Sequence, residues 1–215
     1  MQIQFPKLLN KLTENNKIET IFEDFLKNEE NIIGYFFNHD LLENKIFNNI
    51  DIRNCHFNQT IFSDVIFKNA YFMDIYFENC DLSNVKFQNC LMKRVHFKQC
   101  KLLGSSFIDC VFDHTLYNQS NLQYASFGGN KMKLISFKKN NFKEGSFIDN
   151  LPFNCEFENN DLSLIEFQQT SLNQVNLTTN LIDGVYINLN DLKGAIVSSF
   201  QAIELSRLLG IKIKD

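Results

Sequence analysis

Cysteine and histidine are the side chains of this 215-residue sequence whose types suggest catalysis or metal binding. Four of the six cysteines recur at intervals of ten residues, whereas zinc ligands usually come in closely spaced pairs. The four histidines form no motif with a nucleophile or a metal ligand, and the sequence contains no glycine-rich phosphate loop. We therefore predict no catalytic residue, no metal and no cofactor. An enzyme or a small-ligand binder is the weakest interpretation.

Acidic residues are the other chemically distinctive group, and they gather late in the sequence. Residues 144–192 hold eight acids and no base, whereas residues 86–143 hold ten bases and two acids. The eight acids are Glu144, Asp149, Glu156, Glu158, Asp161, Glu166, Asp183 and Asp191. An acidic surface attracts a basic partner surface, because complementary fields steer association. The alternative is solvated charge that keeps the protein soluble. A net charge of −4 argues against nonspecific nucleic-acid binding.

A period of five residues positions all of these side chains. From Phe47 to Leu192, every fifth residue is large and apolar, and only Pro152 interrupts the series. The residue two places earlier in each repeat is small or β-branched, or is Asn in many later repeats, and the regularly spaced cysteines belong to this set. Neither an α-helix nor an ordinary strand has this period. It predicts short extended segments joined by turns, with two inward side chains per segment and with the cysteines as packed thiols.

The distribution of charge supports a closed interior. Residues 42–195 contain 14 Lys or Arg and 16 Asp or Glu, and only Lys45 occupies an inward position. Burying an unpaired charge costs several kcal/mol, so charged residues are excluded from a dry core. The pattern therefore separates an inside from an outside over about 150 residues.

The number of sides follows from the large apolar residues at every fifth position, where Phe alternates with Leu, Ile and Met. An alternation with a period of ten requires an even number of sides, and four sides give a coil of 20 residues. We predict an all-β, right-handed, four-sided solenoid over residues 42–197, of about seven to eight coils. Two opposite ladders hold Phe47, Phe67, Phe87, Phe107, Phe127, Phe147 and Phe167, and Phe57, Phe77, Phe97, Phe137 and Phe157. Asn140, Asn160 and Asn180 lie one coil apart and predict a stacked amide ladder.

The two ends of the solenoid need covers, because an open terminal coil is an adhesive edge. Residues 1–41 are predicted to form an N-terminal capping segment with an amphipathic helix near residues 17–28, and the alternative is a binding role. In residues 198–215, Ser198 or Ser199 can cap a helix that runs to Leu209, followed by Gly210. This helix either only closes the last coil or also forms a two-fold dimer contact.

The repeat resembles the pentapeptide-repeat family, whose consensus is roughly Ala-(Asp/Asn)-Leu-X-X. Residues 80–84 (Cys-Asp-Leu-Ser-Asn) and 160–164 (Asn-Asp-Leu-Ser-Leu) are examples. Residues 191–195, 200–202 and 208–211 are similar to the ending of Qnr-type quinolone-resistance proteins and of related topoisomerase-protecting immunity proteins. Residues 2–6 (Gln-Ile-Gln-Phe-Pro) look like the start of Qnr-like proteins from Gram-positive bacteria.

This resemblance implies a rod-shaped homodimer, joined through its C-terminal segments, that binds DNA gyrase or topoisomerase IV as a DNA mimic. Such a protein protects the topoisomerase from quinolones or peptide toxins and has no direct contact with nucleic acid or membrane. The eight acids would then form the topoisomerase-binding surface. The predicted dimer contacts are Phe200, Ala202, Leu205, Leu208, Leu209 and Ile211. The alternative is a pentapeptide-repeat scaffold or immunity protein with another partner.

The sequence also carries two negative expectations. The five-residue register does not slip between residues 47 and 192, so large loops that interrupt the coil in many Gram-negative relatives are not expected. No signal peptide and no apolar run of transmembrane length is recognisable, so we expect a cytoplasmic protein.

Overall fold

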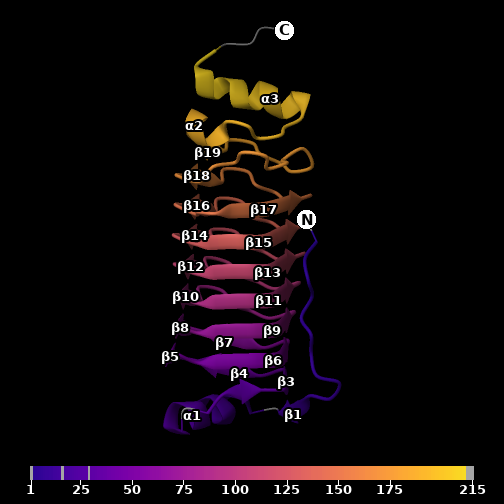
Figure 1. Ribbon diagram of the computed structural model, residues 1–215, viewed down its shortest axis with the longest axis vertical. Helices are drawn as coiled ribbons and strands as arrows, with labels where there is room; N and C mark the ends of the chain where they lie inside the picture. Colours follow the sequence, from indigo (N-terminus) through magenta and orange to yellow (C-terminus); the bar gives the residue numbers. More distant parts are fainter. Residues whose placement is uncertain (1, 16, 29, 212–215) are drawn as a thin grey trace.

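The computed structural model describes residues 2–15, 17–28 and 30–211, and it is a rod of stacked parallel strands. Figure 1 shows helix α1 (Ile18–Asn28) at one end of the rod and helix α3 (Ser199–Leu205) at the other. Residues paired across adjacent strands lie 20 apart, as Lys86 and Ser106 do. The predicted four-sided parallel solenoid is therefore confirmed. No helix among the described residues is long and apolar enough to cross a membrane.

Two long sheets and one short one form the walls of the rod. The nine-stranded sheet contains β1 (Thr13–Asn15), β2 (Ile32–Ile33), β3 (Tyr35–Asn38), β6 (Asp51–Asn58), β9 (Tyr71–Glu78), β11 (Leu91–Lys98), β13 (Val111–Asn118), β15 (Lys131–Lys138) and β17 (Phe153–Glu158). The eight-stranded sheet contains β5 (Ile46–Asn48), β8 (Ile66–Lys68), β10 (Lys86–Gln88), β12 (Ser106–Ile108), β14 (Ser126–Gly128), β16 (Ser146–Ile148), β18 (Glu166–Gln168) and β19 (Tyr186–Ile187). The third sheet pairs β4 (Leu41–Glu43) with β7 (Ile61–Ser63), and single bridges continue it to residue 181.

Each coil has four sides, which we name A to D. Side A holds residues 56–59 and their equivalents 20 residues apart, side B residues 61–64, side C residues 66–69 and side D residues 71–74. The eight-residue strands bend at a corner and span sides D and A. Corner residues such as Asn54 and Asp74 have φ values of 53° and 59°. Asn and Asp tolerate this left-handed conformation better than most residues, which explains why they are frequent at the corners.

Two stacks of aromatic rings fill the core, one behind side A and one behind side C. The predicted Phe residues of both ladders are at most 4% exposed. Neighbouring rings within a stack have centroids 4.6 to 5.6 Å apart, and Tyr117 takes one place in the side A stack. Rings of the two stacks also meet edge to face, as Phe107 and Tyr117 do at 5.9 Å. Each buried ring contributes roughly 1.5–3 kcal/mol through the area removed from water.

At several small inward positions the side chain is also a hydrogen-bond donor. The Cys80 thiol lies 3.3 Å from the carbonyl oxygen of Phe57, and the Cys100 thiol lies 3.3 Å from that of Phe77. Asn140 Nδ2 donates to the Tyr117 carbonyl in the same geometry, at 3.0 Å. The donor thus reaches a carbonyl 23 residues earlier and satisfies a buried backbone group.

The inward asparagines form ladders along the rod. Asn140 Nδ2 donates to Asn160 Oδ1 at 3.0 Å, and Asn160 Nδ2 donates to Asn180 Oδ1 at 2.9 Å. A second ladder, which the sequence analysis did not identify, links Asn130 Nδ2 to Asn150 Oδ1 at 2.9 Å. Thr170 Oγ1 extends it by accepting the Asn150 backbone N–H at 3.2 Å.

The regular register is interrupted at two places. Asp113 pairs with Leu134 rather than with Lys133. Met132 pairs with Phe153 rather than with Pro152, and the register recovers at Cys155. Pro152 is exposed, follows a cis peptide bond, and leaves the inward place to the Phe153 ring, which packs 5.4 Å from Phe147. The expectation that the register never slips is therefore wrong at these two places. No large loop interrupts the coils across the described residues 32–196, whose pairing is otherwise continuous.

The N-terminal end is closed by α1, as the amphipathic pattern near residues 17–28 predicted. Phe22 is buried and meets Phe47 edge to face at 5.1 Å. Parallel pairing starts upstream of residue 42, since Ile32 pairs with Ile52 and Phe37 with Phe57. The five-residue series therefore extends back to Ile32.

The one inward charge of the solenoid belongs to this end. Lys45 Nζ lies 3.0 Å from Glu23 and 3.5 Å from Glu19, both on α1. The cap helix thus supplies the partners for the single cation that the repeat admits to its inner face.

The C-terminal end is closed by three short helices, α2 (Leu189–Leu192), α3 and the 3₁₀ helix η1 (Ser206–Leu209). Ser198 caps α3 in a capping box with Gln201, and Gly210 ends η1 with a φ of 70°. Both features agree with the predicted helix from Ser198 to Leu209. Gln201 Nε2 donates to the carbonyls of Leu177 and Asn180 at 2.7 and 2.8 Å, which satisfies backbone groups of the last coil. Residues 211–214 alternate Ile and Lys, and only Ile211 of this segment is among the described residues.

Candidate functional site

The eight acids predicted to form a binding surface are distributed over all four sides. Side B carries Glu144, Asp161 and Asp183, and side C carries Asp149 and Glu166. Within the part of the chain that the structure describes, none of these five carboxylates lies within 4.0 Å of a Lys, Arg or His nitrogen. Sides B and C of the C-terminal half therefore present acidic charge that no side-chain cation neutralises.

The remaining three acids are engaged by neighbours. Lys138 lies 2.9 Å from Glu158 and 3.6 Å from Glu156 on side A, and its hydrogen bond holds the pKa of Glu158 below its ordinary value. Asp191 Oδ2 accepts the backbone N–H of Gln169 at 3.1 Å, next to side D. A partner that binds acidic charge would therefore contact sides B and C rather than sides A and D.

The C-terminal cap presents an apolar surface. Phe200 is 84% exposed, and Leu209 and Ile211 are more than half exposed. Ala202 and Leu208 are exposed beside them, whereas Leu205 is buried against its own chain. A hollow of about 260 Å³ opens on the cap, lined by Leu192, Val197, Ala202, Leu205 and Leu209 among others. Of the six predicted dimer contacts, five are thus available to a partner, and Leu205 lines the hollow's floor.

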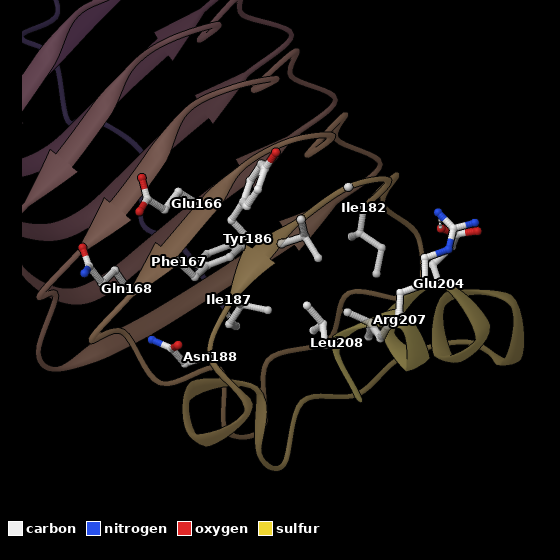
Figure 2. A pocket seen from close by; sticks show the side chains of 13 residues that line it. Glu166, Phe167, Gln168, Ile182, Tyr186, Ile187, Asn188, Glu204, Arg207 and Leu208 are labelled. Atoms are coloured by element: carbon white, nitrogen blue, oxygen red, sulfur yellow. Dashed lines mark ion pairs between the residues drawn. The ribbon is translucent and has the colours of Figure 1, made fainter. Parts of the chain in front are cut away.

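A larger cavity, of about 530 Å³, lies between the last coils and the C-terminal helices. Figure 2 shows Phe167, Ile182, Ile187 and Leu208 around it, with Glu204 and Arg207 at one edge. Glu204 and Arg207 form an ion pair of 3.0 Å with each other. Tyr186 and Glu166 lie at the opposite edge in Figure 2. The lining brings together no nucleophile and base.

The cysteines lie at the small inward position. Burial raises the pKa of Cys55 to about 11, and it also raises the pKa of Cys155. A thiol with a raised pKa is rarely a thiolate and is a poor nucleophile or metal ligand. Among the described residues, no group of three or more His, Cys, Asp or Glu side chains could hold a metal ion.

The N-terminal strap, which we define as residues 2–12, is a feature that the sequence analysis did not anticipate. Figure 1 shows this segment, in indigo, running along the outside of the rod toward α1. Gln4 N–H donates to His114 Nδ1 at 3.2 Å, and Lys7 N–H donates to Asp74 Oδ1 at 2.8 Å. Thr13, at the start of β1, donates to the Gly34 carbonyl at 2.7 Å. The strap therefore follows the corner between sides D and A.

Beneath the strap lies a buried ion pair. Arg94 Nε and Nη2 each lie 2.6 Å from an Asp74 carboxylate oxygen, and both residues are at least 90% buried although they occupy outward corner positions. Burial acts to raise the pKa of Asp74, but hydrogen bonds from Arg94 and from the Lys7 N–H outweigh it, so this pKa lies below its ordinary value. The corner is thus an organised polar site and not a solvated edge.

These features define a class of protein: a parallel four-sided solenoid with an acidic stretch on sides B and C and an apolar C-terminal cap. Residues 50–127 match the family described as pentapeptide repeat region. No curated protein matches the sequence.

Solved structures of QnrB1, a plasmid-mediated fluoroquinolone resistance protein, have the same fold. One trypsin-treated variant is 24% identical, with a TM-score of 0.58 over 86% of this chain and 92% of QnrB1. A second is 21% identical, with a TM-score of 0.57 over 95% and 99%. The full-length form is 20% identical, with a TM-score of 0.53 over 93% and 95%. Similarity at this level establishes a shared fold along nearly the whole chain.

Proposed function

We propose that this protein is a non-enzymatic partner of a type II DNA topoisomerase, either gyrase or topoisomerase IV, and that it relieves poisoning by quinolones or related agents. The observation that carries the proposal is the fold match to a fluoroquinolone resistance protein over at least 86% of this chain and 92% of that one. The unpaired acids of sides B and C support it, because a topoisomerase surface that holds DNA must be basic.

Sides B and C would act in place of DNA. Successive coils stack about 4.8 Å apart and each carries a carboxylate on side B, in a different column, so that acidic groups recur along the rod as phosphates do along a duplex. Glu144, Asp161 and Asp183 follow one another in this way on side B. A basic groove shaped for DNA can receive such a line through complementary fields.

The acidic surface can be tested with a triple charge reversal, Glu144→Lys/Asp161→Lys/Asp183→Lys. We expect the variant to lose about tenfold or more in affinity for the cognate topoisomerase, since complementary charge becomes repulsive. In a supercoiling assay with ciprofloxacin, it should fail to restore activity at concentrations where the unmodified protein does.

The chain offers a matched control in Asp64→Lys/Asp81→Lys/Glu43→Lys. These residues occupy the same three columns of side B nearer the N-terminal end, and Asp81 accepts the Ser83 N–H as Asp161 accepts the Ser163 N–H. The control variant should still protect the topoisomerase from ciprofloxacin. If neither form of the protein binds or rescues gyrase or topoisomerase IV at any ratio, the proposed function is wrong. If the reversed triple rescues as well as its control, only the acidic-surface mechanism fails.

The proposal includes a homodimer joined through the apolar C-terminal cap. Phe200 is the most exposed large apolar residue of that cap, and the apolar hollow of the same cap is of a size to receive one ring from a second copy. A two-fold contact repeats this insertion on both partners and doubles the buried apolar area. It would also place the acidic halves of two rods next to each other.

Replacing Phe200 with Glu is expected to convert the dimer into a monomer at micromolar concentration, because a carboxylate would enter an apolar contact. Sedimentation equilibrium measures the change in mass. The matched control is Leu151→Glu, which changes a residue that is 60% exposed on the irregular coil away from the cap. Dimerisation through the cap is disproved if both variants have the same mass as the unmodified protein, or if the unmodified protein is itself monomeric.

A further inference from the structure

The corner between sides D and A contains a polar group that its present cover leaves unsatisfied. His96 occupies an outward position of side A, yet it is only 4% exposed. Neither of its ring nitrogens has a hydrogen-bond partner among the described residues. Burial, followed by the nearby Lys98, lowers the pKa of His96 to about 4, so the ring is neutral at physiological pH. A buried imidazole without partners is unfavourable, and native structures seldom retain one without a reason.

The strap covers His96 with a side chain that cannot bond to it. The Phe5 ring meets the imidazole edge-on at 5.6 Å, and the Tyr76 ring, one coil earlier in the same column, lies 4.7 Å away. Phe5 offers no donor or acceptor in its side chain, so this contact leaves both ring nitrogens without a partner. The strap therefore fits the corner in shape and backbone contacts but not in polarity.

The strap is also held by few contacts. Phe5 and Leu9 are 55% and 51% exposed. Between residues 8–14 and the rod lies a cavity of about 890 Å³, lined also by Phe36 and His56. Within the described residues 2–12, the hydrogen bonds to the rod are those from Gln4 and Lys7. Segments with so little buried contact open at low free-energy cost.

The floor beneath the strap is by contrast fixed. Asp74 is held by Arg94 through two bonds, and its Oδ1 still accepts a backbone N–H from the strap. His114 Nδ1 accepts a second N–H, from a residue three positions earlier in the strap. These acceptors recognise the main chain of an extended segment without regard to its side chains, as sheet edges do in strand addition.

We propose that this corner is a docking site for an extended segment of a partner protein that places a hydroxyl or amide donor on His96, with the strap as its tethered competitor. The strap shows how the segment lies: two backbone N–H groups three residues apart face His114 and Asp74, and the intervening side chain covers His96. The site lies at the corner between sides D and A, which is opposite the corner between sides B and C. It is therefore separate from the proposed topoisomerase surface, and neither proposal depends on the other.

A tethered competitor has an effective concentration near the millimolar range, so it hides the site from weak ligands. The test uses the full chain with the strap released by Phe5→Ala/Lys7→Pro, which removes the ring on His96 and the N–H that Asp74 accepts. The probes are two fluorescent peptides of residues 2–9, one with the native sequence and one with Phe5→Tyr. A peptide of scrambled sequence is the control.

We expect the released chain to bind the native peptide about tenfold or more tightly than the unmodified chain does, as measured by fluorescence anisotropy. The Phe5→Tyr peptide should bind a further fivefold or so more tightly, because its hydroxyl satisfies the imidazole. Adding His96→Phe to the released chain should remove this preference for tyrosine while leaving binding of the native peptide. Equal binding of all three peptides, or of the two probes, overturns the proposal.

Hydrogen exchange on the unmodified chain provides a second measurement that does not depend on how the released variant folds. An excess of the Phe5→Tyr peptide should speed exchange of the tethered Gln4 and Lys7 amides, because the peptide displaces the strap. Exchange in strands β9 to β13 should remain unchanged. If the tethered amides exchange at the same rate with and without the peptide, the strap is a fixed part of the fold and the proposal is wrong.

Discussion

Replacing Asn160 with leucine is expected to lower the free energy of unfolding by about 4 kcal/mol, although the two side chains are of similar size. The Asn160 amide makes four hydrogen bonds inside the rod. Its Oδ1 accepts from the backbone N–H and the Nδ2 of Asn140, and its Nδ2 donates to the Phe137 carbonyl and to Asn180 Oδ1. Leucine removes the Asn160 bond from the Asn140 backbone N–H and from the Phe137 carbonyl, and a buried group that loses its partner costs about 1–3 kcal/mol, offset in part by the added apolar burial. Asn140 Nδ2 and Asn180 Oδ1 each lose one of two bonds and keep the Tyr117 carbonyl and the residue 160 backbone N–H.

Urea unfolding followed by circular dichroism measures this change, and Asn154→Leu is its matched control. Asn154 is exposed in β17, so the same substitution removes no buried hydrogen bond there. We expect the control to change stability by less than about 0.5 kcal/mol. Equal losses at the two positions would show that the ladder contributes nothing beyond burial.

The fold was predictable because every repeat has the same pattern of inward apolar and outward polar residues. Every fifth residue from Phe47 to Leu192 gives thirty positions, and all but Pro152 hold a large apolar residue. No other period fits this series. The second ladder was also accessible from the sequence, since Asn130, Asn150 and Thr170 are separated by 20 residues like the first three asparagines. The period does not reveal why these inward positions hold a polar residue. The structure shows that its side chain donates a hydrogen bond to the carbonyl 23 residues earlier.

Features outside the repeat were not predictable in the same way. The strap contacts the rod through backbone N–H groups and single side chains, so its path leaves no pattern in the sequence. Its register depends on acceptors as distant as His114, 110 residues away from Gln4. Phe153 takes the inward place that the five-residue period assigns to Pro152, because the larger ring of this adjacent residue fills it.

The candidate surfaces were partly predictable. Charge along the chain separated the acidic half, and the 20-residue coil assigned each acid to a side. The sequence could not indicate that Lys138 engages Glu156 and Glu158, because the ion pairs join side chains 18 to 20 residues apart in neighbouring coils. Likewise, Leu205 and Leu209 were both predicted as dimer contacts, whereas Leu205 is buried against its own chain and Leu209 is exposed.

Truncating Phe127 to alanine is expected to reduce the free energy of unfolding by about 4 kcal/mol and to divide unfolding into two transitions. Phe127 is fully buried and contacts six other rings: two in its own stack, two in the facing stack, and Phe112 and Phe142 on the sides between. Those rings stand in rigid stacks about 5 Å apart, which cannot collapse into the space that the lost ring leaves. The cavity therefore remains and adds to the lost burial.

The second part of this expectation follows from the one-dimensional architecture. Each coil contacts only its neighbours, so cooperativity passes through every coil in turn. Phe127 lies near the middle of the rod, and weakening that coil uncouples the half capped by α1 from the half capped by α3. Hydrogen exchange resolves the two halves separately during urea unfolding, and Leu151→Ala, at an exposed position, is the control. A single transition with the full loss of stability would show that cooperativity extends beyond nearest neighbours, through the aromatic stacks that run along the core.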